Sequence, residues 1–171
     1  EDVGAGGMKF DLATGTDLTV FDIPVHVRRT GEKKASAETP DSDSSPSPRA
    51  VHVITPICFE ATKSSHTRAL AYTRGRRRAD LLINASNDGW FGTPDSTLGK
   101  ITGGREQHLQ ASRWRCVELG IPMIRAVNTG ISAFVDRHGK LRQAGPDGRD
   151  TPINVDGVMI ANVDVNLGSA G

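Results

Sequence analysis

Cys58 is the residue whose type and surroundings most favour chemistry in this sequence. It stands at the end of the compact, β-branched run Val51–Ile57, immediately before a segment that could begin a helix. Backbone amides at a helix N-terminus stabilise a thiolate, and the amide of Phe59 could face the oxyanion that forms when sulfur attacks a carbonyl. Glu60 could orient or protonate a reacting group, or could instead interact with the helix dipole. On spacing alone, both a nucleophile and an inert buried thiol fit Cys58.

A second polar segment follows the apolar run Leu81–Ile83. It reads Asn-Ala-Ser-Asn-Asp-Gly-Trp-Phe-Gly, from Asn84 to Gly92. A strand that ends in an Asn-rich, Gly-rich turn is where α/β folds place functional groups. We therefore expect functional side chains in this turn as well as at Cys58.

The remaining apolar patterns predict an α/β fold built on a layered sheet. One clear helix is expected from about Arg105 to Leu119, closed by Gly120 and Pro122. Its stripe of apolar and small side chains places Cys116 in the core. Further strands are expected at Leu18–Val27, Met123–Val127, Ile131–Val135 and about Val158–Val165. Strands that alternate with helices and then follow one another argue against a helical bundle or a sandwich made only of strands.

Composition excludes several classes of function. The 171 residues carry a formal net charge of +1, which gives no electrostatic case for nucleic acid as a partner. No apolar run approaches the roughly 20 residues of a membrane-spanning helix. Two cysteines are too few for a disulfide scaffold and form no paired zinc motif, and the five histidines are scattered singly. We therefore expect neither a metal nor a cofactor.

Two strongly polar stretches have less specific interpretations. Residues 28–49 contain three prolines, five serines and mixed charges, so we expect an exposed loop within one domain rather than a linker between two. The cluster Arg74, Arg76, Arg77 and Arg78 is interpreted as a solvated helix end, with contact to an anionic surface as the alternative.

Four blocks of sequence occur in a defined order between Val51 and Leu141. They are Pro56-Ile57-Cys58-Phe59-Glu60; the segment from Asn84 to Gly92; Gln107-His108-Leu109-Gln110, continuing through Arg113 and Arg115 to Glu118-Leu119-Gly120-Ile121-Pro122; and Arg125-Ala126-Val127-Asn128-Thr129-Gly130-Ile131-Ser132. In this combination they resemble the nitrilase-like domain of bacterial apolipoprotein N-acyltransferases, a branch of the carbon-nitrogen hydrolase superfamily. The second and third blocks look more like this branch than like the soluble amidases of the superfamily.

The resemblance implies a four-layer α-β-β-α sandwich, of which residues 1–171 would form part of one domain. It also implies a Glu-Lys-Cys catalytic set in which Cys58 matches the nucleophile. The thiolate would take an acyl chain from a phospholipid as a thioester. The free amine of a lipoprotein's diacylglyceryl-modified N-terminal cysteine would then accept that chain as an amide, so that one difficult transfer is split into two easier ones.

The resemblance extends to individual side chains around Cys58. Glu60 matches the family's glutamate just after the nucleophile, and Phe59 stands where the family often has tyrosine, with its amide available to the oxyanion site. Trp90 and Phe91 would flank the acyl chain or the mouth of the site, or would anchor their loop in the core. The family also implies attachment to the bacterial inner membrane through segments absent from this chain, with the catalytic domain on the periplasmic side.

Two features of the family are missing from this sequence. The general base glutamate and the catalytic lysine lie upstream of the cysteine, and the Lys-then-Leu-Val-Pro-Phe-Gly-Glu type of motif is absent. Lys9 lies 49 residues before Cys58, but its neighbours do not match, so it is not assigned. We therefore expect the C-terminal half of a catalytic domain, excerpted or degenerate, and inactive on its own. A soluble carbon-nitrogen hydrolase and a non-catalytic binding domain remain as alternatives.

Overall fold

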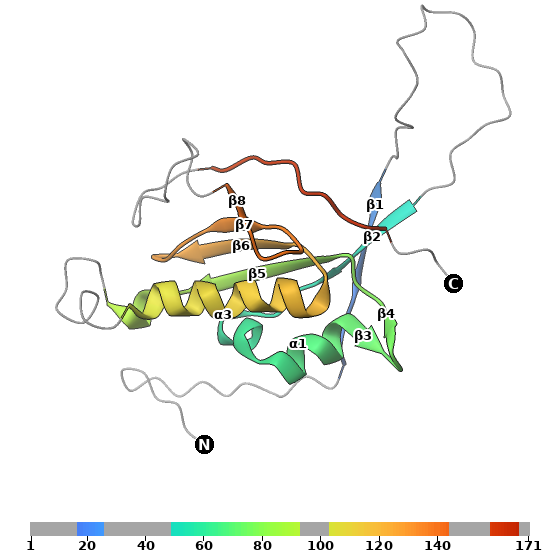
Figure 1. Cartoon of the computed structure of the whole chain (residues 1–171), viewed down its shortest axis with the longest axis horizontal. Helices are drawn as coiled ribbons and strands as arrows, with labels where there is room; N and C mark the ends of the chain where they lie inside the picture. Colours follow the sequence, from blue (N-terminus) through green and yellow to red (C-terminus); the bar gives the residue numbers. More distant parts are fainter. Residues whose placement is uncertain (1–16, 26–48, 93–102, 144–157, 168–171) are drawn as a thin grey trace, which may run out of the picture.

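The computed structural model describes residues 17–25, 49–92, 103–143 and 158–167 of the chain (Figure 1). The strands are β1 (Phe21–Val25), β2 (Arg49–Ile54), β3 (Tyr72–Thr73), β4 (Arg76–Arg77), β5 (Leu81–Asn87), β6 (Met123–Asn128), β7 (Ala133–Val135) and β8 (Leu141–Gln143). The helices are α1 (Ser64–Ala71) and α3 (Gly104–Leu119), and the short 3-10 turns are η1 (Cys58–Thr62) and η2 (Gly89–Phe91). The expected polar loop lies outside the described residues, except for Arg49, which begins β2.

One six-stranded sheet organises these elements in the order β1-β2-β5-β6-β7-β8. Neighbours β2, β5 and β6 run parallel, while β1, β7 and β8 pair antiparallel. Parallel strands end at the same edge of a sheet, so Cys58, after β2, and Asp88, after β5, come to one edge. This is the placement expected for functional groups in an α/β fold.

Helices α1 and α3 cover one face of this sheet (Figure 1). The buried cluster between them and the sheet includes Ile54, Leu70, Leu82, Leu109, Cys116, Leu119 and Met123. Cys116 is fully buried, which confirms its predicted place in the core. Helix α3 ends before Gly120, whose φ of 66° is the left-handed conformation that favours glycine after a helix. The predicted α/β class is confirmed.

The opposite face of the sheet is covered by the segment 158–167. Its inward side chains Val163, Val165 and Leu167 pack on a second cluster that contains Val51, Val53 and Leu81. The prediction of a strand at about Val158–Val165 is wrong, because this segment is not part of the sheet's strands. Its side chains nevertheless alternate between partly buried and exposed. Alternating burial requires only that an extended chain lies on the sheet, so it does not by itself establish a hydrogen-bonded ladder.

Two further expectations are corrected by the structure. Strand β5 continues to Asn87 instead of ending after Ile83, so Asn84 lies within the strand. The arginine cluster does not end a helix, because α1 stops at Ala71 and the chain turns back through Arg74 and Gly75 to form the β3–β4 hairpin. None of the described helices is long and apolar enough to cross a bilayer.

Candidate active site

Cys58 occupies a strained turn at the edge of the sheet. Its φ of 49° places a non-glycine residue in the left-handed region, which costs roughly 1–2 kcal/mol and needs support from surrounding contacts. The residue is partly exposed, so it is not sealed inside the core. Turn η1 begins at this residue and leads into α1 through Lys63. The helix start predicted just after Cys58 is instead a short 3-10 turn that includes Cys58 itself.

Glu60 holds this turn together through the backbone of Ile57. Its Oε2 atom accepts a hydrogen bond from the Ile57 amide at 2.8 Å, and its own amide donates to the Ile57 carbonyl at 3.0 Å. His66 Nε2 lies 3.8 Å from the same carboxylate oxygen. In this conformation the Glu60 side chain supports the turn that presents Cys58. A role of Glu60 toward substrate stays a prediction.

The three aromatic residues singled out from the sequence have different surroundings. Phe59 and Trp90 are 60% and 68% exposed, so neither anchors its turn in the core. Phe91 is partly buried, its ring contacts His108 edge-on, and it packs so closely on Gly104 that a Cβ atom there would overlap the ring. Phe91 thus packs within its loop, and contact of Phe59, Trp90 or Phe91 with an acyl chain stays a prediction.

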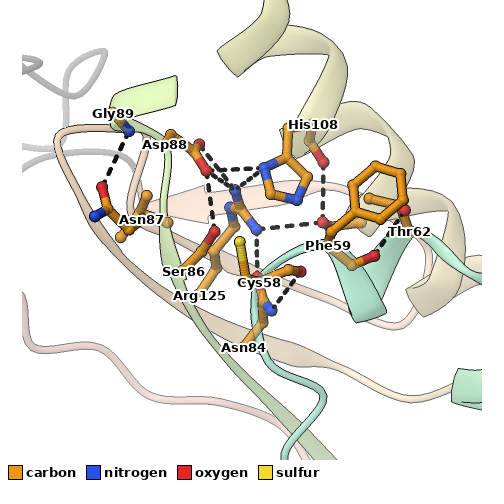
Figure 2. A network of polar contacts seen from close by, with 12 residues as sticks. Cys58, Phe59, Thr62, Asn84, Ser86, Asn87, Asp88, Gly89, His108 and Arg125 are labelled. Atoms are coloured by element: carbon orange, nitrogen blue, oxygen red, sulfur yellow. Dashed lines mark hydrogen bonds and ion pairs between the residues drawn. The ribbon is translucent and has the colours of Figure 1, made fainter. Parts of the chain in front are cut away.

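A buried polar network lies beside Cys58 (Figure 2). Arg125 donates from Nη2 to the carboxylate oxygens of Asp88 at 3.0 and 3.3 Å. Its Nη1 donates to Oδ1 of Asn84 and lies 3.3 Å from Oγ of Ser112. His108 Nδ1 lies 2.8 Å from Asp88 Oδ1. The guanidinium is thus held between the carboxylate on one side and the Asn84 amide on the other.

Opposite charges keep Asp88 and Arg125 ionised despite their burial. Burial raises the pKa of the Asp88 carboxyl, but the hydrogen bond from His108 and the charge of Arg125 outweigh it, so that pKa lies below its ordinary value of 3.8. Burial lowers the pKa of Arg125, and the charge and the hydrogen bonds of Asp88 oppose that effect. Figure 2 shows the Arg125 side chain next to that of Cys58.

His108 supports the carboxylate and keeps one ring nitrogen without a partner. An ionised carboxylate can only accept, so Nδ1 of His108 must carry the proton that Asp88 accepts. Nε2 is buried and has no hydrogen-bond partner among the described residues. The imidazole centroid lies 6.3 Å from that of Phe59 and 5.8 Å from that of Phe91. Sequence reasoning left His108 as one of several scattered histidines, because its partner lies in another element.

We expect iodoacetamide to alkylate Cys58 and to spare Cys116 in the native chain. Burial raises the pKa of the Cys116 thiol to about 12, and no part of that residue is exposed, whereas Cys58 is partly exposed. Only the thiolate reacts at a useful rate. Peptide mass spectrometry measures both sites, and protein unfolded in guanidinium provides the control in which both react. Equal labelling of the two cysteines in the native chain would contradict this assignment.

The described ranges contain no group of three or more His, Cys, Asp or Glu side chains that could hold a metal ion. The groups that the structure describes near Cys58 include its thiol, the Glu60 carboxylate at the turn and the buried pair of Asp88 and Arg125. Such a set can form and break a covalent bond to an acyl carbon.

Comparison with known proteins identifies relatives of about half of this chain. No protein-family model matches the chain. Apolipoprotein N-acyltransferases are similar to it: that of Sinorhizobium medicae is 47% identical over 85 residues, and that of Haemophilus influenzae is 41% identical over 97 residues. These matches cover 50% and 57% of this chain but only 14% and 16% of the relatives.

Carbon-nitrogen hydrolases are among the solved structures that match parts of this chain. The enzyme from Helicobacter pylori has a TM-score of 0.46 at 14% identity and covers 59% of this chain and 38% of its own. An amidase of the nitrilase superfamily from Nesterenkonia has a TM-score of 0.39 at 19% identity, covering 55% of this chain and 33% of its own. The sequence matches, at 37% to 47% identity, show that about half of this chain is homologous to apolipoprotein N-acyltransferases, as its sequence blocks predicted.

Proposed function

We propose that this chain supplies the nucleophile, Cys58, of a lipoprotein N-acyltransferase. In the first step the Cys58 sulfur attacks the ester carbonyl of a phospholipid, an S–C bond forms, and the ester C–O bond breaks. The lysophospholipid leaves as an alcohol and takes up the proton lost by the thiol. In the second step the N-terminal amine of a diacylglyceryl-modified lipoprotein attacks the thioester, the amide forms, and the sulfur leaves and recovers a proton.

The observation that carries this proposal is the presentation of Cys58. The residue is partly exposed in a left-handed turn, and the buried Arg125 side chain lies next to it (Figure 2). Apolar side chains beside it and at the neighbouring turn are exposed as well, with Ile57 at 63%, Phe59 at 60% and Trp90 at 68%. Exposed apolar groups around a nucleophile suit an acyl chain, because burying them against it removes apolar surface from water.

Substrates and location belong to the same proposal, because the chain matches only 14% to 16% of the length of its relatives. The donor is a phospholipid of the bacterial inner membrane, and the acceptor is an apolipoprotein on the periplasmic side. The base that removes the thiol proton, and the lysine of the family's catalytic set, would come from sequence upstream of the motif carried here. We accordingly propose that the 171-residue chain does not form the thioester alone.

The test is the detection of an acyl group on Cys58. The protein encoded by the complete gene is incubated with phosphatidylethanolamine vesicles that carry an isotope-labelled acyl chain, and its peptides are analysed by mass spectrometry. We expect a hydroxylamine-sensitive adduct on Cys58 in the wild type and in Cys116→Ala, but none in Cys58→Ala. An acyl adduct that persists in Cys58→Ala refutes the proposal.

A second arm of this test separates acyl transfer from hydrolysis. When a lipopeptide with a free N-terminal cysteine amine is added, the label should move to that amine. If the label instead appears only as free fatty acid, water is the acceptor and the protein acts as a hydrolase. If no adduct forms on any folded preparation, the non-catalytic alternative holds.

A further inference from the structure

In addition to Glu60, a side chain of the neighbouring strand β5, Asn84, holds the turn that presents Cys58. Nδ2 of Asn84 donates to the carbonyl of Pro56 at 2.8 Å and to the carbonyl of Cys58 at 3.3 Å. These two carbonyls lie on either side of Ile57, at the point where β2 gives way to η1. Asn84 has no exposed surface, so water does not compete for these bonds.

Arg125 determines which way the Asn84 amide faces. A guanidinium carries only donors, so the atom of Asn84 that meets Nη1 must be the carbonyl oxygen. The amide nitrogen is then directed at the two backbone carbonyls of the turn. Asn84 and Arg125 are register partners on β5 and β6, so the pairing of these strands brings the two side chains together. Figure 2 shows both side chains next to Cys58.

Arg125 in turn has little freedom to move. Its side chain has no exposed surface, and its other terminal nitrogen donates to Asp88. Ser112 on α3 lies 3.3 Å from Nη1, so the guanidinium is held between the sheet and the helical layer. The chain of contacts therefore runs from a buried ion pair, through one amide, to the backbone of the candidate nucleophile.

We propose that Asn84 and Arg125 form a positioning pair for Cys58: Asn84 holds the left-handed turn, and Arg125 holds Asn84. This inference rests on the proposed role of Cys58 as nucleophile and assigns two residues that support it without touching substrate. The left-handed backbone at Cys58 raises the free energy of the folded state, so contacts from surrounding residues must stabilise it. Correct placement of a nucleophile by fractions of an ångström is worth large factors in rate.

The first experiment measures whether the pair holds the turn. Hydrogen exchange of the 171-residue chain is followed by mass spectrometry in peptides that cover residues 55–63. Asn84→Ala removes both hydrogen bonds to the turn. We expect amide exchange in these peptides to become about tenfold faster, because the net free energy of one to two hydrogen bonds corresponds to about this factor. Asn84→Thr keeps a hydroxyl donor and should restore most of the protection.

A matched control removes a comparable hydrogen bond elsewhere. Tyr72→Phe loses the bond from the Tyr72 hydroxyl to the Leu119 carbonyl at 2.8 Å, a bond that involves neither Asn84 nor the turn, and should leave exchange at residues 55–63 unchanged. Arg125→Lys keeps the charge but lacks the fork that reaches Asp88 and Asn84 together, so it should resemble Asn84→Ala. Unchanged exchange in a folded Asn84→Ala protein overturns the proposal, and Arg125→Lys is the second test if Asn84→Ala does not fold.

The second experiment measures acylation by the protein from the complete gene. We expect Asn84→Ala and Arg125→Lys to lower kcat about tenfold while KM for the phospholipid stays within about twofold, as befits residues that position the nucleophile rather than bind substrate. Faster exchange with unchanged kcat overturns the positioning role. Absence of acylation in the wild type would refute the proposed function alone, because the exchange experiment still decides whether Asn84 and Arg125 hold the turn.

Discussion

Replacing Asp88 with alanine is expected to lower the free energy of unfolding by about 3–5 kcal/mol. The carboxylate and the guanidinium of Arg125 both have no exposed surface, and removal of the carboxylate leaves a buried cation without its counter-ion. The same change takes away the partner of His108 Nδ1. Urea unfolding followed by circular dichroism measures the loss. The control is Asp22→Ala, whose carboxylate is 69% exposed and should cost less than about 1 kcal/mol.

The pH dependence of this loss follows from the direction of the Asp88 pKa. Because the folded-state pKa lies below 3.8, ionised Asp88 contributes stability that is complete above that value and is lost as pH falls through the lower, folded value. The difference in stability between wild type and Asp88→Ala should therefore stay constant from about pH 7 to pH 5 and narrow below about pH 4. A difference that widens on acidification would contradict an ionised Asp88.

Local sequence signals were sufficient for the elements whose determinants are close together in the chain. The helix that ends at Leu119 was predicted to within one residue, because Gly120 is both a helix stop and a residue that adopts a positive φ. The β-branched run before Cys58 correctly predicted a strand, although β2 spans Arg49–Ile54 instead of Val51–Ile57, so that Cys58 follows the strand after three further residues. Cys116 was placed in the core by its helical stripe, and it is fully buried.

Local signals failed where partners are distant in sequence. Asn84 and Arg125 are 41 residues apart and meet only through the parallel pairing of β5 and β6, which no local pattern specifies. Both interrupt apolar strands at positions that face the helical layer, where an apolar side chain is expected. Such an interruption is the one signal in the sequence that could have marked them as a buried polar pair.

The arginine cluster illustrates a different limit. Arg77 donates to Asp80 at 3.2 Å, and Arg78 donates to the Leu18 carbonyl at 2.6 Å. A run of basic residues has the same composition on a solvated helix end and on a hairpin whose side chains reach other segments. Only the turn at Arg74 and Gly75, both with positive φ, distinguishes the two, and a single glycine among arginines was too weak a signal to predict it.

Gly130→Ala is expected to destabilise the protein by about 1–3 kcal/mol through a clash with Asp88. A Cβ atom at Gly130 would lie 2.5 Å from Oδ2 of Asp88 and 2.5 Å from Cγ1 of Val127. The carboxylate cannot retreat without lengthening its bonds to Arg125 or His108, so the added methyl group strains the buried network itself. Urea unfolding measures the cost.

A double-mutant cycle distinguishes this clash from a general effect of alanine in the loop. A Cβ atom at Gly130 would also lie 2.7 Å from Cβ of Asp88, so the Asp88→Ala background removes only the contact with the carboxylate oxygen. In that background Gly130→Ala should still cost less than in the wild type, with a coupling energy of about 0.5–3 kcal/mol. All four proteins are compared in the same stabilising osmolyte, so that the weakest remains folded. If the losses in free energy of unfolding are additive, the methyl group at position 130 does not clash with the Asp88 carboxylate. The loop after β6 would then be able to move away from the ion pair.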